Sequence, residues 1–516
     1  MTKKLAVVWY VLVTLLIGTL FVAIKAEVVR TTSVDLAHNY ALVFRLAENS
    51  QLLPNDPTLG EMNIYPSGSH AIAAFVGKLV DSSFLGMHLS SLVSVVLLWA
   101  SCMAILYAAP NRSGPFNAMV LAAVVILNFG AFRIHGSEIV RAYYYAQLMG
   151  QSLIFAAIAA AIWLDGRLHR AWIYALMLGV IHVVSGIHLL PALELLGLLA
   201  GVALLDAVFA QGSARARIGA ALLSGAVIAA GIAVVLLHPS FAAMRSISLH
   251  NGGIWLGPLR AMWAVVIVSL IVLASSVSLL RAWYRDRAGS VAYKYLAVYG
   301  AAVAALFLLQ VVLRHFNLGS DYAAKKYGFG LVTFLFLRLA LWLGPKLRVR
   351  LERQPQRALW FNSGSGRLAV FGLALAATLA GIAHSRRGVD TMAVAGIERQ
   401  LIALHATSLP APVAGKPNLV VDTEGMPDVI NYMFTTAVAR MPREAALRIF
   451  EGGERLQPLT QLSQYGYILS SRGSSRFARA DHCARLPSGP ILVLDGACVD
   501  QVAAGTPPAV AAAAAR

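Results

Sequence analysis

The chain has 516 residues, of which 58% are hydrophobic and only 13% are charged, and its formal net charge is +18. A soluble protein usually carries about 25% charged residues, so this composition argues against a soluble globular chain and indicates a polytopic helical membrane protein. The excess lysines and arginines lie mostly in short loops between apolar segments. This is the pattern expected of cytoplasmic loops, and it argues against nucleic acid as a partner.

Apolar segments recur from residue 1 to about residue 384. The first follows Lys3 and Lys4 and resembles a signal peptide, but it lacks a convincing cleavage site, so we expect an uncleaved span. The segment 171–211 is too long for one span, and Ser185-Gly186 is the expected turn within it. In total we expect about eleven spans, near residues 5–24, 86–108, 117–134, 150–165, 171–185, 188–210, 218–237, 258–281, 294–314, 327–344 and 367–384.

The distribution of basic loops predicts the orientation of the chain. With the N-terminus in the cytoplasm, most of the densest basic loops face the cytoplasm, as the positive-inside rule requires. An odd number of spans then places everything after residue 384 on the periplasmic side of a bacterial inner membrane. Cys483 and Cys498 both fall in this exported part and suit a disulfide. Cys102 lies in an apolar run, where we interpret it as a packing residue.

The region between the first two spans, about residues 25–85, is long for a connection, and long loops are usually functional. Apolar residues at three- and four-residue spacing predict a helix over Asp35–Ala47, and Pro54-Asn55-Asp56-Pro57 indicates a turn. A second short helix is expected over Ser69–Val80. We expect this loop to lie on the membrane surface.

The exported part, residues 385–502, alternates strand and helix signals. Short β-type runs are expected at 418–421, 467–470 and 491–494, and helices at 426–438 and 442–451. A small α/β domain follows from this alternation. The last segment, 503–516, is rich in alanine and proline, and we expect it to be disordered. The fold class is therefore an all-α membrane domain over 1–384 with a small periplasmic α/β domain.

Nucleotide-binding glycine motifs, HExxH and cysteine zinc sites are absent from the sequence. Candidate groups gather instead in the expected external loops. Asp35 and His38 share one helix face, although Asp35 also suits a plain helix N-terminus. The macrodipole there is expected to favour its ionised form. Tyr65 and His70 flank a turn that leads into an apolar helix, where a simple serine cap is the alternative.

Three further groups stand out. His135, Glu138 and Arg141 are followed by tyrosines, which suit either a site or an interfacial aromatic belt. Cations cluster late in the chain on the expected external side, where they can bind a phosphate or contact lipid headgroups; the cluster comprises Arg314, Lys325 and Lys326, with Tyr327 beside them. Ionisable groups at membrane depth are candidates by default, and these are His182, His188 and Glu194.

Taken together, these features resemble the GT-C superfamily of polytopic glycosyltransferases, which use sugars carried on polyprenyl phosphate. The resemblance rests on Asp35 within Asp35-Leu36-Ala37-His38 just after the first span, and on Tyr65-Pro66, Lys326-Tyr327 and the exported domain. The second acidic position of the family would fall at Glu138, without a close motif to secure it.

The resemblance implies inverting transfer at the periplasmic face from a polyprenyl-phosphate-linked sugar donor. Asp35 would act as general base, with His38 and Glu138 as further catalytic candidates. The donor phosphate would meet Lys325, Lys326, Tyr327 and Arg314, and other substrate contacts would come from Tyr65, His70, His135, Arg141 and His188. The acceptor is a glycan, a lipid or a protein, and a divalent metal, Mg or Mn, is a possible cofactor.

Two other functions fit parts of the same pattern. A transporter or flippase of lipid-linked sugars explains many spans and intramembrane ionisable groups, but it explains the long first loop and the exported domain less well. A polymerase or ligase of the O-antigen type would also use a lipid-linked sugar. We rank it lower because the external arginines are scattered.

Overall fold

The computed structural model describes residues 34–49, 52, 54–110, 114–131, 145–249, 259–353, 390–408, 415–423, 425–453, 455–486 and 490–503. The expected spans 5–24 and 367–384 lie outside these residues, as do His135, Glu138, Arg141 and nearly all of the expected disordered tail. The expected total of about eleven spans therefore stays a prediction.

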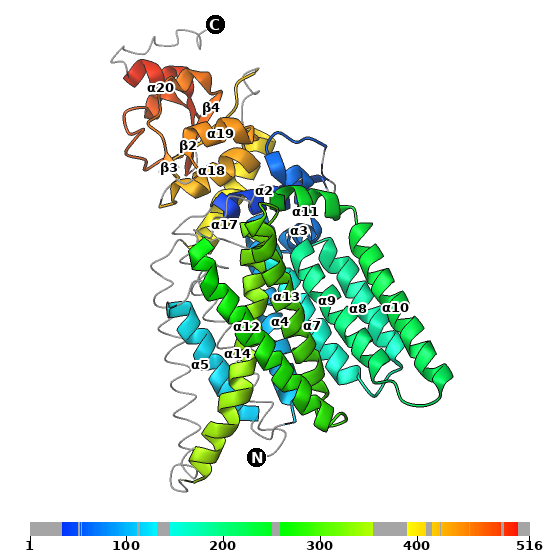
Figure 1. Cartoon of the computed structure of the whole chain (residues 1–516). Coiled ribbons are helices and arrows are strands. Elements are labelled where there is room, and N and C mark those ends of the chain that lie inside the picture. The colour runs from blue at the N-terminus through cyan, green and yellow to red at the C-terminus, as the bar shows by residue number, and fades with distance from the viewer. Residues whose placement is uncertain are drawn as a thin grey trace.

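Each expected span between residues 86 and 344 coincides with a helix, and these helices form one bundle (Figure 1). They are α4 (Ser83–Ala108), α5 (Gly114–Ala131), α7 (Tyr145–Leu164), α8 (Arg170–Ser185), α9 (Leu189–Val208), α10 (Ala214–Leu236), α12 (Leu259–Arg285), α13 (Val291–His315) and α14 (Asp321–Glu352). Within the described residues, seven helices are long and apolar enough to cross a membrane, namely α4, α7, α9, α10, α12, α13 and α14. The chain is a multi-pass membrane protein on this evidence.

The surface of the bundle has the character of a lipid-facing surface. On α10, for example, Leu222 is 70% exposed and Leu236 is 54% exposed. Large exposed apolar faces of this kind are rare on soluble monomers. The turn expected at Ser185-Gly186 is present, because α8 ends at Ser185 and α9 begins at Leu189.

A buried ion cluster ties four helices together at the end of the bundle far from the C-terminal domain. The Lys294 ammonium at the start of α13 lies 2.7 Å from Asp165, beyond the end of α7, and 3.4 Å from Asp206 on α9. Arg170 at the start of α8 contacts the same two carboxylates at 3.0 and 2.9 Å. Because Lys294 is only 1% exposed, the cluster satisfies charges that would otherwise be buried alone.

The long first loop folds onto the opposite end of the bundle (Figure 1). It contains α2 (Val34–Asn49), a 3-10 turn at Gly60–Ile64 and α3 (Gly68–Val80), so both expected helices are present. Gly86 lets α4 approach α3 closely, since a Cβ there would lie 2.4 Å from the Ala73 carbonyl oxygen. In the expected turn, the Asp56 carboxylate contacts Arg45 of α2 at 3.1 Å.

The C-terminal α/β region lies beside α2 at this same end (Figure 1). Its four-stranded sheet has the order β1-β4-β6-β5, with β1 (Leu419–Val420) parallel to β4 (Tyr467–Ser471) and the other neighbours antiparallel. β6 spans Ile491–Asp495 and β5 spans Ala484–Leu486, while β2 (Phe450–Glu451) and β3 (Arg455–Leu456) form a separate hairpin. Its helices are α18 (Asp428–Ala437), α19 (Arg443–Ile449) and α20 (Gly496–Ala503).

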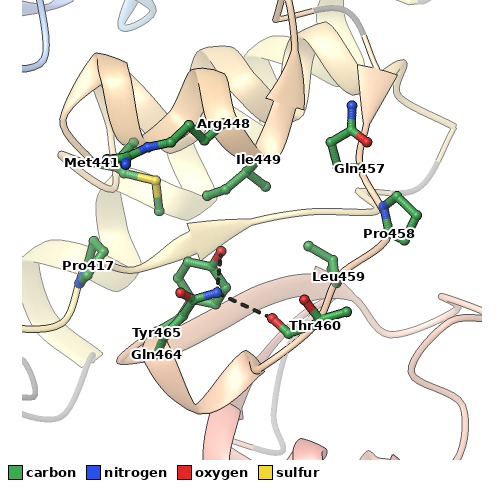
Figure 2. A pocket seen from close by; sticks show the side chains of 11 residues that line it. Pro417, Met441, Arg448, Ile449, Gln457, Pro458, Leu459, Thr460, Gln464 and Tyr465 are labelled. Atoms are coloured by element: carbon green, nitrogen blue, oxygen red, sulfur yellow. Dashed lines mark hydrogen bonds between the residues drawn. The ribbon is translucent and has the colours of Figure 1, made fainter.

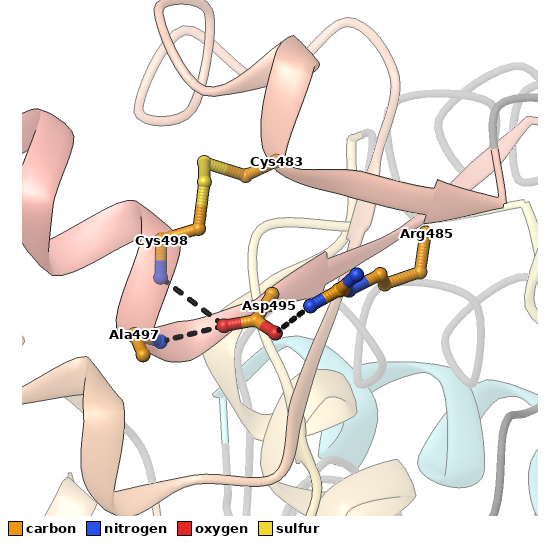
Figure 3. The surroundings of a disulfide bond; sticks show 5 residues. All are labelled: Cys483, Arg485, Asp495, Ala497 and Cys498. Carbon is orange, nitrogen blue, oxygen red and sulfur yellow. Dashed lines mark hydrogen bonds and ion pairs between the residues drawn. A yellow bond between two sulfur atoms is a disulfide. The ribbon is translucent and has the colours of Figure 1, made fainter. Parts of the chain in front are cut away.

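A disulfide joins Cys483 to Cys498, the pairing expected from the sequence (Figure 3). It connects the segment before β5 to α20. Beside it, the Asp495 carboxylate accepts hydrogen bonds from the backbone N–H groups of Ala497 at 3.0 Å and Cys498 at 3.1 Å, and it pairs with Arg485 at 2.7 Å. Cys102 is a buried free cysteine in α4.

The sequence did not predict two helices that flank the first loop. These are α11 (Ser240–Leu249) and α17 (Thr391–Ala403), which is followed by a short π-helix at Leu404–Ser408. Glu398 of α17 is fully buried and accepts hydrogen bonds from the Tyr40 hydroxyl at 2.9 Å and the Ser83 backbone N–H at 2.9 Å. It also accepts from the Ser82 hydroxyl. This carboxylate therefore fixes α17 against α2 and against the start of α4.

Candidate active site

Asp35 lies in the first turn of α2, and α2 lies between the helical bundle and the C-terminal domain (Figure 1). Its side chain is half-buried. Burial raises its pKa to about 6, although the positive charge of Lys326 opposes this effect. Glu61 raises the pKa further, whereas Arg443 and Lys325 lower it. The carboxyl group thus titrates close to neutral pH, which is the range that suits a general base.

This pKa corrects one expectation from the sequence. The helix macrodipole was expected to favour the ionised carboxylate, but the pKa moves in the opposite direction. The reason is that the macrodipole contributes only modestly near a solvated terminus, whereas removing a carboxylate from water disfavours its charged form more strongly. At pH 7 a group with a pKa of about 6 is still mostly ionised.

His38 lies one turn after Asp35 and contacts the C-terminal domain. A hydrogen bond of 3.2 Å joins its Nε2 atom to the hydroxyl of Tyr432 on α18. Burial lowers the pKa of His38 to about 3, and the nearby Arg443 adds to this effect. His38 is therefore neutral, so it can exchange hydrogen bonds but does not carry a positive charge at neutral pH.

His70 holds α3 against α2. Its Nε2 atom lies 2.7 Å from the Asn39 amide oxygen, and the Asn39 amide donates in turn to the Asp35 backbone carbonyl at 2.7 Å. The imidazole is fully buried, and burial lowers its pKa to about 3. A neutral His70 thus supports the turn of α2 that carries Asp35.

A chain of polar contacts connects Tyr65 to the start of α14. Tyr65 and Tyr322 share a hydrogen bond, and the Tyr322 hydroxyl lies 2.9 Å from His188 Nε2. The Lys326 ammonium lies over the Tyr322 ring, 5.1 Å from its centroid. His188 is fully buried and caps α9 through its Nδ1 atom, which accepts from the Leu190 backbone N–H at 3.3 Å. The structure therefore brings together residues that are more than 250 positions apart in sequence.

The expected cationic cluster divides into two parts. Lys325 is half-buried and Lys326 is 3% exposed, and both act electrostatically on Asp35. Arg314 instead forms an ion pair with Asp321 across the turn from α13 to α14, at 2.9 Å. Tyr327 is 1% exposed and packs in the bundle core. Because α14 begins at Asp321, both lysines lie within its first two turns, before the position expected from the sequence.

The C-terminal domain contributes two groups that the sequence did not predict, Arg443 and Tyr432. Arg443 at the start of α19 pairs with Glu61 at 3.1 Å and donates to the Leu59 carbonyl at 3.2 Å. It also hydrogen-bonds Tyr432, the partner of His38. A single arginine in a short amphipathic helix is an ordinary feature of a surface, so no signal in the sequence marked it.

A second polar group lies deeper in the bundle. The Glu194 carboxylate is fully buried and accepts hydrogen bonds from the Tyr299 hydroxyl at 2.8 Å and the Gln151 amide at 3.0 Å. Its other oxygen has no hydrogen-bond partner among the described residues. Gln147 connects this group to the start of α14, because its amide nitrogen contacts the Gln151 amide oxygen at 3.3 Å and the Lys326 backbone carbonyl at 3.5 Å. The bundle therefore contains a polar path below the candidate site.

The groups available to a metal ion are limited in the described part of the chain. His482 lies with Cys483 and Cys498, but these sulfur atoms are bonded to each other and offer no thiolate. At the candidate site, Asp35 and Glu61 offer the oxygen ligands that Mg²⁺ prefers. The cations beside Asp35 already compensate its charge, so the site as described is a poor match for a second, divalent cation.

The chain was compared with protein-family models, curated proteins and solved structures. No family model matches the chain, and no curated protein matches it. Among solved structures, the chain is similar to the crystal structure of the Archaeoglobus fulgidus oligosaccharyltransferase in complex with Zn and sulfate. The two share 12% sequence identity over 87% of this chain and 68% of that chain, with a TM-score of 0.42. Likeness at this level indicates nothing about the activity of this chain.

Proposed function

We propose that this chain is a membrane glycosyltransferase that moves a sugar from a polyprenyl-phosphate carrier to an acceptor hydroxyl at the periplasmic face. The observation that carries the proposal is the pairing of opposite charges at one end of the bundle. A half-buried carboxylate with a pKa of about 6 lies within electrostatic reach of two lysines. Transfer from a phosphate carrier needs both a base for the acceptor and cations for the leaving group.

In this proposal Asp35 accepts the proton of the acceptor hydroxyl. The acceptor oxygen attacks the anomeric carbon from the side opposite the phosphate, so a new carbon–oxygen bond forms while the bond to the phosphate oxygen breaks. The configuration at the anomeric carbon inverts, and the electron pair leaves with the phosphate. A pKa of about 6 leaves Asp35 ionised at neutral pH and still basic enough to take the proton.

Lys325 and Lys326 would stabilise the charge that develops on the departing phosphate. A lysine ammonium binds phosphate well, and low solvent exposure strengthens the interaction. Arg314 would act less directly, because it already pairs with Asp321. Tyr65, Tyr327, His70 and His188 remain candidates for shaping or contacting the donor site. The roles of His135, Glu138 and Arg141 remain predictions from the sequence.

The topology belongs to the same proposal. About eleven spans, a cytoplasmic N-terminus and a periplasmic domain from residue 385 would place Asp35 where a lipid-borne sugar meets a polar acceptor. A fluorescent reporter that matures only in the cytoplasm, fused after Arg516, tests this orientation. A dark fusion with normal expression is expected, and bright fluorescence would contradict the topology.

A transporter of lipid-linked sugars is the second candidate, favoured by the buried group of Glu194, Gln151 and Tyr299. Purified protein in nanodiscs, supplied with radiolabelled polyprenyl-phosphate sugars and a mixture of glycan, lipid and peptide acceptors, distinguishes the two. Labelled acceptor of inverted configuration is expected. Movement of the labelled lipid across proteoliposomes without any transfer would instead favour the transporter.

A further inference from the structure

The C-terminal domain contains a pocket of about 420 Å³ that is separate from the candidate active site (Figure 2). It lies between α19, the segment after β3 and the 3-10 turn at Leu462–Gln464. The short helix α19 contributes residues both beside the candidate active site and to the pocket. Arg443 at its start contacts Glu61 beside the candidate site, whereas Arg448 at its end lines the pocket.

The inner surface of the pocket is apolar and includes an aromatic ring. Figure 2 shows Ile449 of α19 and Leu459 of the facing segment around Tyr465. The Tyr465 side chain is mostly buried, and its hydroxyl accepts a hydrogen bond from the Gln464 amide at 3.1 Å, which fixes the ring. A flat aromatic ring among aliphatic side chains matches the C–H face of a sugar ring, which is apolar although its edge is not.

The rim of the pocket is polar. The Thr460 hydroxyl and the second N–H of the Gln457 amide offer donors to a ligand, and the amide oxygens of Gln457 and Gln464 offer acceptors. The Gln457 amide nitrogen donates to Glu451 at 3.2 Å and the Gln464 amide nitrogen to the Thr460 carbonyl at 3.3 Å, so neither of these bonds uses an amide oxygen. Mixed donors and acceptors around an apolar floor suit a ligand that carries several hydroxyl groups.

Arg448 adds a charge to this rim. It is exposed and lines the pocket, and no ion pair joins it to another residue that the structure describes. A guanidinium group binds a carboxylate through two parallel hydrogen bonds, which makes it the side chain best suited to an acidic sugar. The volume falls within the range of small-ligand sites, about 300–1,000 Å³, which is enough for one or two sugar rings.

We propose that this pocket binds an acidic sugar residue, with the ring against Tyr465 and Leu459 and the carboxylate on Arg448. The inference goes beyond the proposed transfer reaction, because it requires binding and no turnover. A proline-rich peptide is the competing ligand, since Pro417 and Pro458 also line the pocket. The exposed guanidinium of Arg448 favours the sugar, because the internal residues of such a peptide offer it no carboxylate.

The test uses the full-length protein in nanodiscs and saturation-transfer NMR without any lipid donor. The probes are trisaccharides of galacturonate, glucuronate and mannuronate, each paired with its methyl ester, and a proline-rich peptide. At least one acid trisaccharide is expected to bind, and its methyl ester should bind at least about tenfold more weakly, because esterification removes the charge that Arg448 contacts.

Arg448→Gln should weaken binding of the acid trisaccharide by a similar factor, at least about tenfold. Arg476→Gln is the matched control, because Arg476 is exposed in the same domain and does not line the pocket. Both arginines are at the surface, so neither change should unfold the domain. Asp35→Asn should leave binding unchanged, which separates this inference from the proposed reaction. Failure of every acid trisaccharide to bind, equal binding of acids and esters, or binding of the peptide alone would overturn the proposal.

Discussion

Replacing Lys326 with glutamine tests whether Lys326 controls the pKa of Asp35. Lys326 is only 3% exposed, and among the charges around Asp35 it opposes the effect of burial most strongly. With Lys326 in place, the pKa of Asp35 is about 6. A nearby opposite charge lowers a carboxyl pKa by roughly one pH unit or more, so Lys326→Gln should raise the pKa of Asp35 to about 7 or higher.

The sign of the effect on activity follows from the role of the base. Asp35 must be ionised to accept a proton, so activity falls as the pH drops through its pKa. A group with a pKa of about 6 is roughly 90% ionised at pH 7, and one with a pKa of about 7 is roughly half ionised. The acid limb of kcat/KM should therefore move to higher pH. The donor KM should also rise by about tenfold or more, because a charge-assisted contact to phosphate is lost.

The assay is the pH dependence of sugar transfer between pH 5 and pH 9, measured at several donor concentrations. Lys325→Gln is the matched control, because Lys325 acts on Asp35 more weakly than Lys326 does and its loss should shift the acid limb less. An acid limb and a donor KM that are both unchanged in folded Lys326→Gln protein would refute the coupling. Lys326 would then be only a buried cation over an aromatic ring.

Three further predictions concern stability, each measured by unfolding of the purified protein in detergent. Lys294→Ala should cost about 3–5 kcal/mol, because it leaves the buried Asp165 carboxylate without its closest ammonium group; an unchanged melting temperature would contradict this. Glu398→Gln should cost about 1.5–3 kcal/mol through weaker hydrogen bonds to α2 and α4, and an unchanged free energy of unfolding would argue against it. The disulfide between Cys483 and Cys498 encloses a separation of 15 residues, so replacing both cysteines with serine should cost about 3 kcal/mol, and dithiothreitol should not destabilise that variant further.

Much of the fold could be predicted because its signals are local. Long apolar runs predict spans, and the recurrence of Leu36, Tyr40 and Val43 predicts α2, so these elements are present where expected. Other elements depend on their neighbours. β5 has three residues, of which Arg485 is exposed, so it is a strand only because β6 pairs with it. The short helix α11 likewise has no strong periodic signal, and nothing in its composition separated it from a loop.

The candidate site was harder to predict because its parts come from distant segments. Local sequence marks Asp35 as a candidate and the family resemblance implies its role as base, but neither could show that Lys326 acts on it. Tyr432 and Arg443 approach only because α18 packs against α2, which no motif encodes. The sign of the pKa shift at Asp35 was missed for the same reason. It depends on how deeply the neighbouring elements bury the carboxyl group, whereas the helix terminus alone suggested the opposite.

The most direct test of the proposed function is the rate of sugar transfer by Asp35→Asn under single-turnover conditions with bound lipid donor. Loss of a general base typically slows a reaction about 10²–10⁴-fold, and asparagine keeps the size of the side chain. Asp81→Asn is the matched control, because the Asp81 side chain is 94% exposed in a turn of the same loop. We expect Asp35→Asn to bind the donor but transfer the sugar slowly, and Asp81→Asn to transfer it at the normal rate. Near-normal transfer by Asp35→Asn would contradict the role of Asp35 as the base.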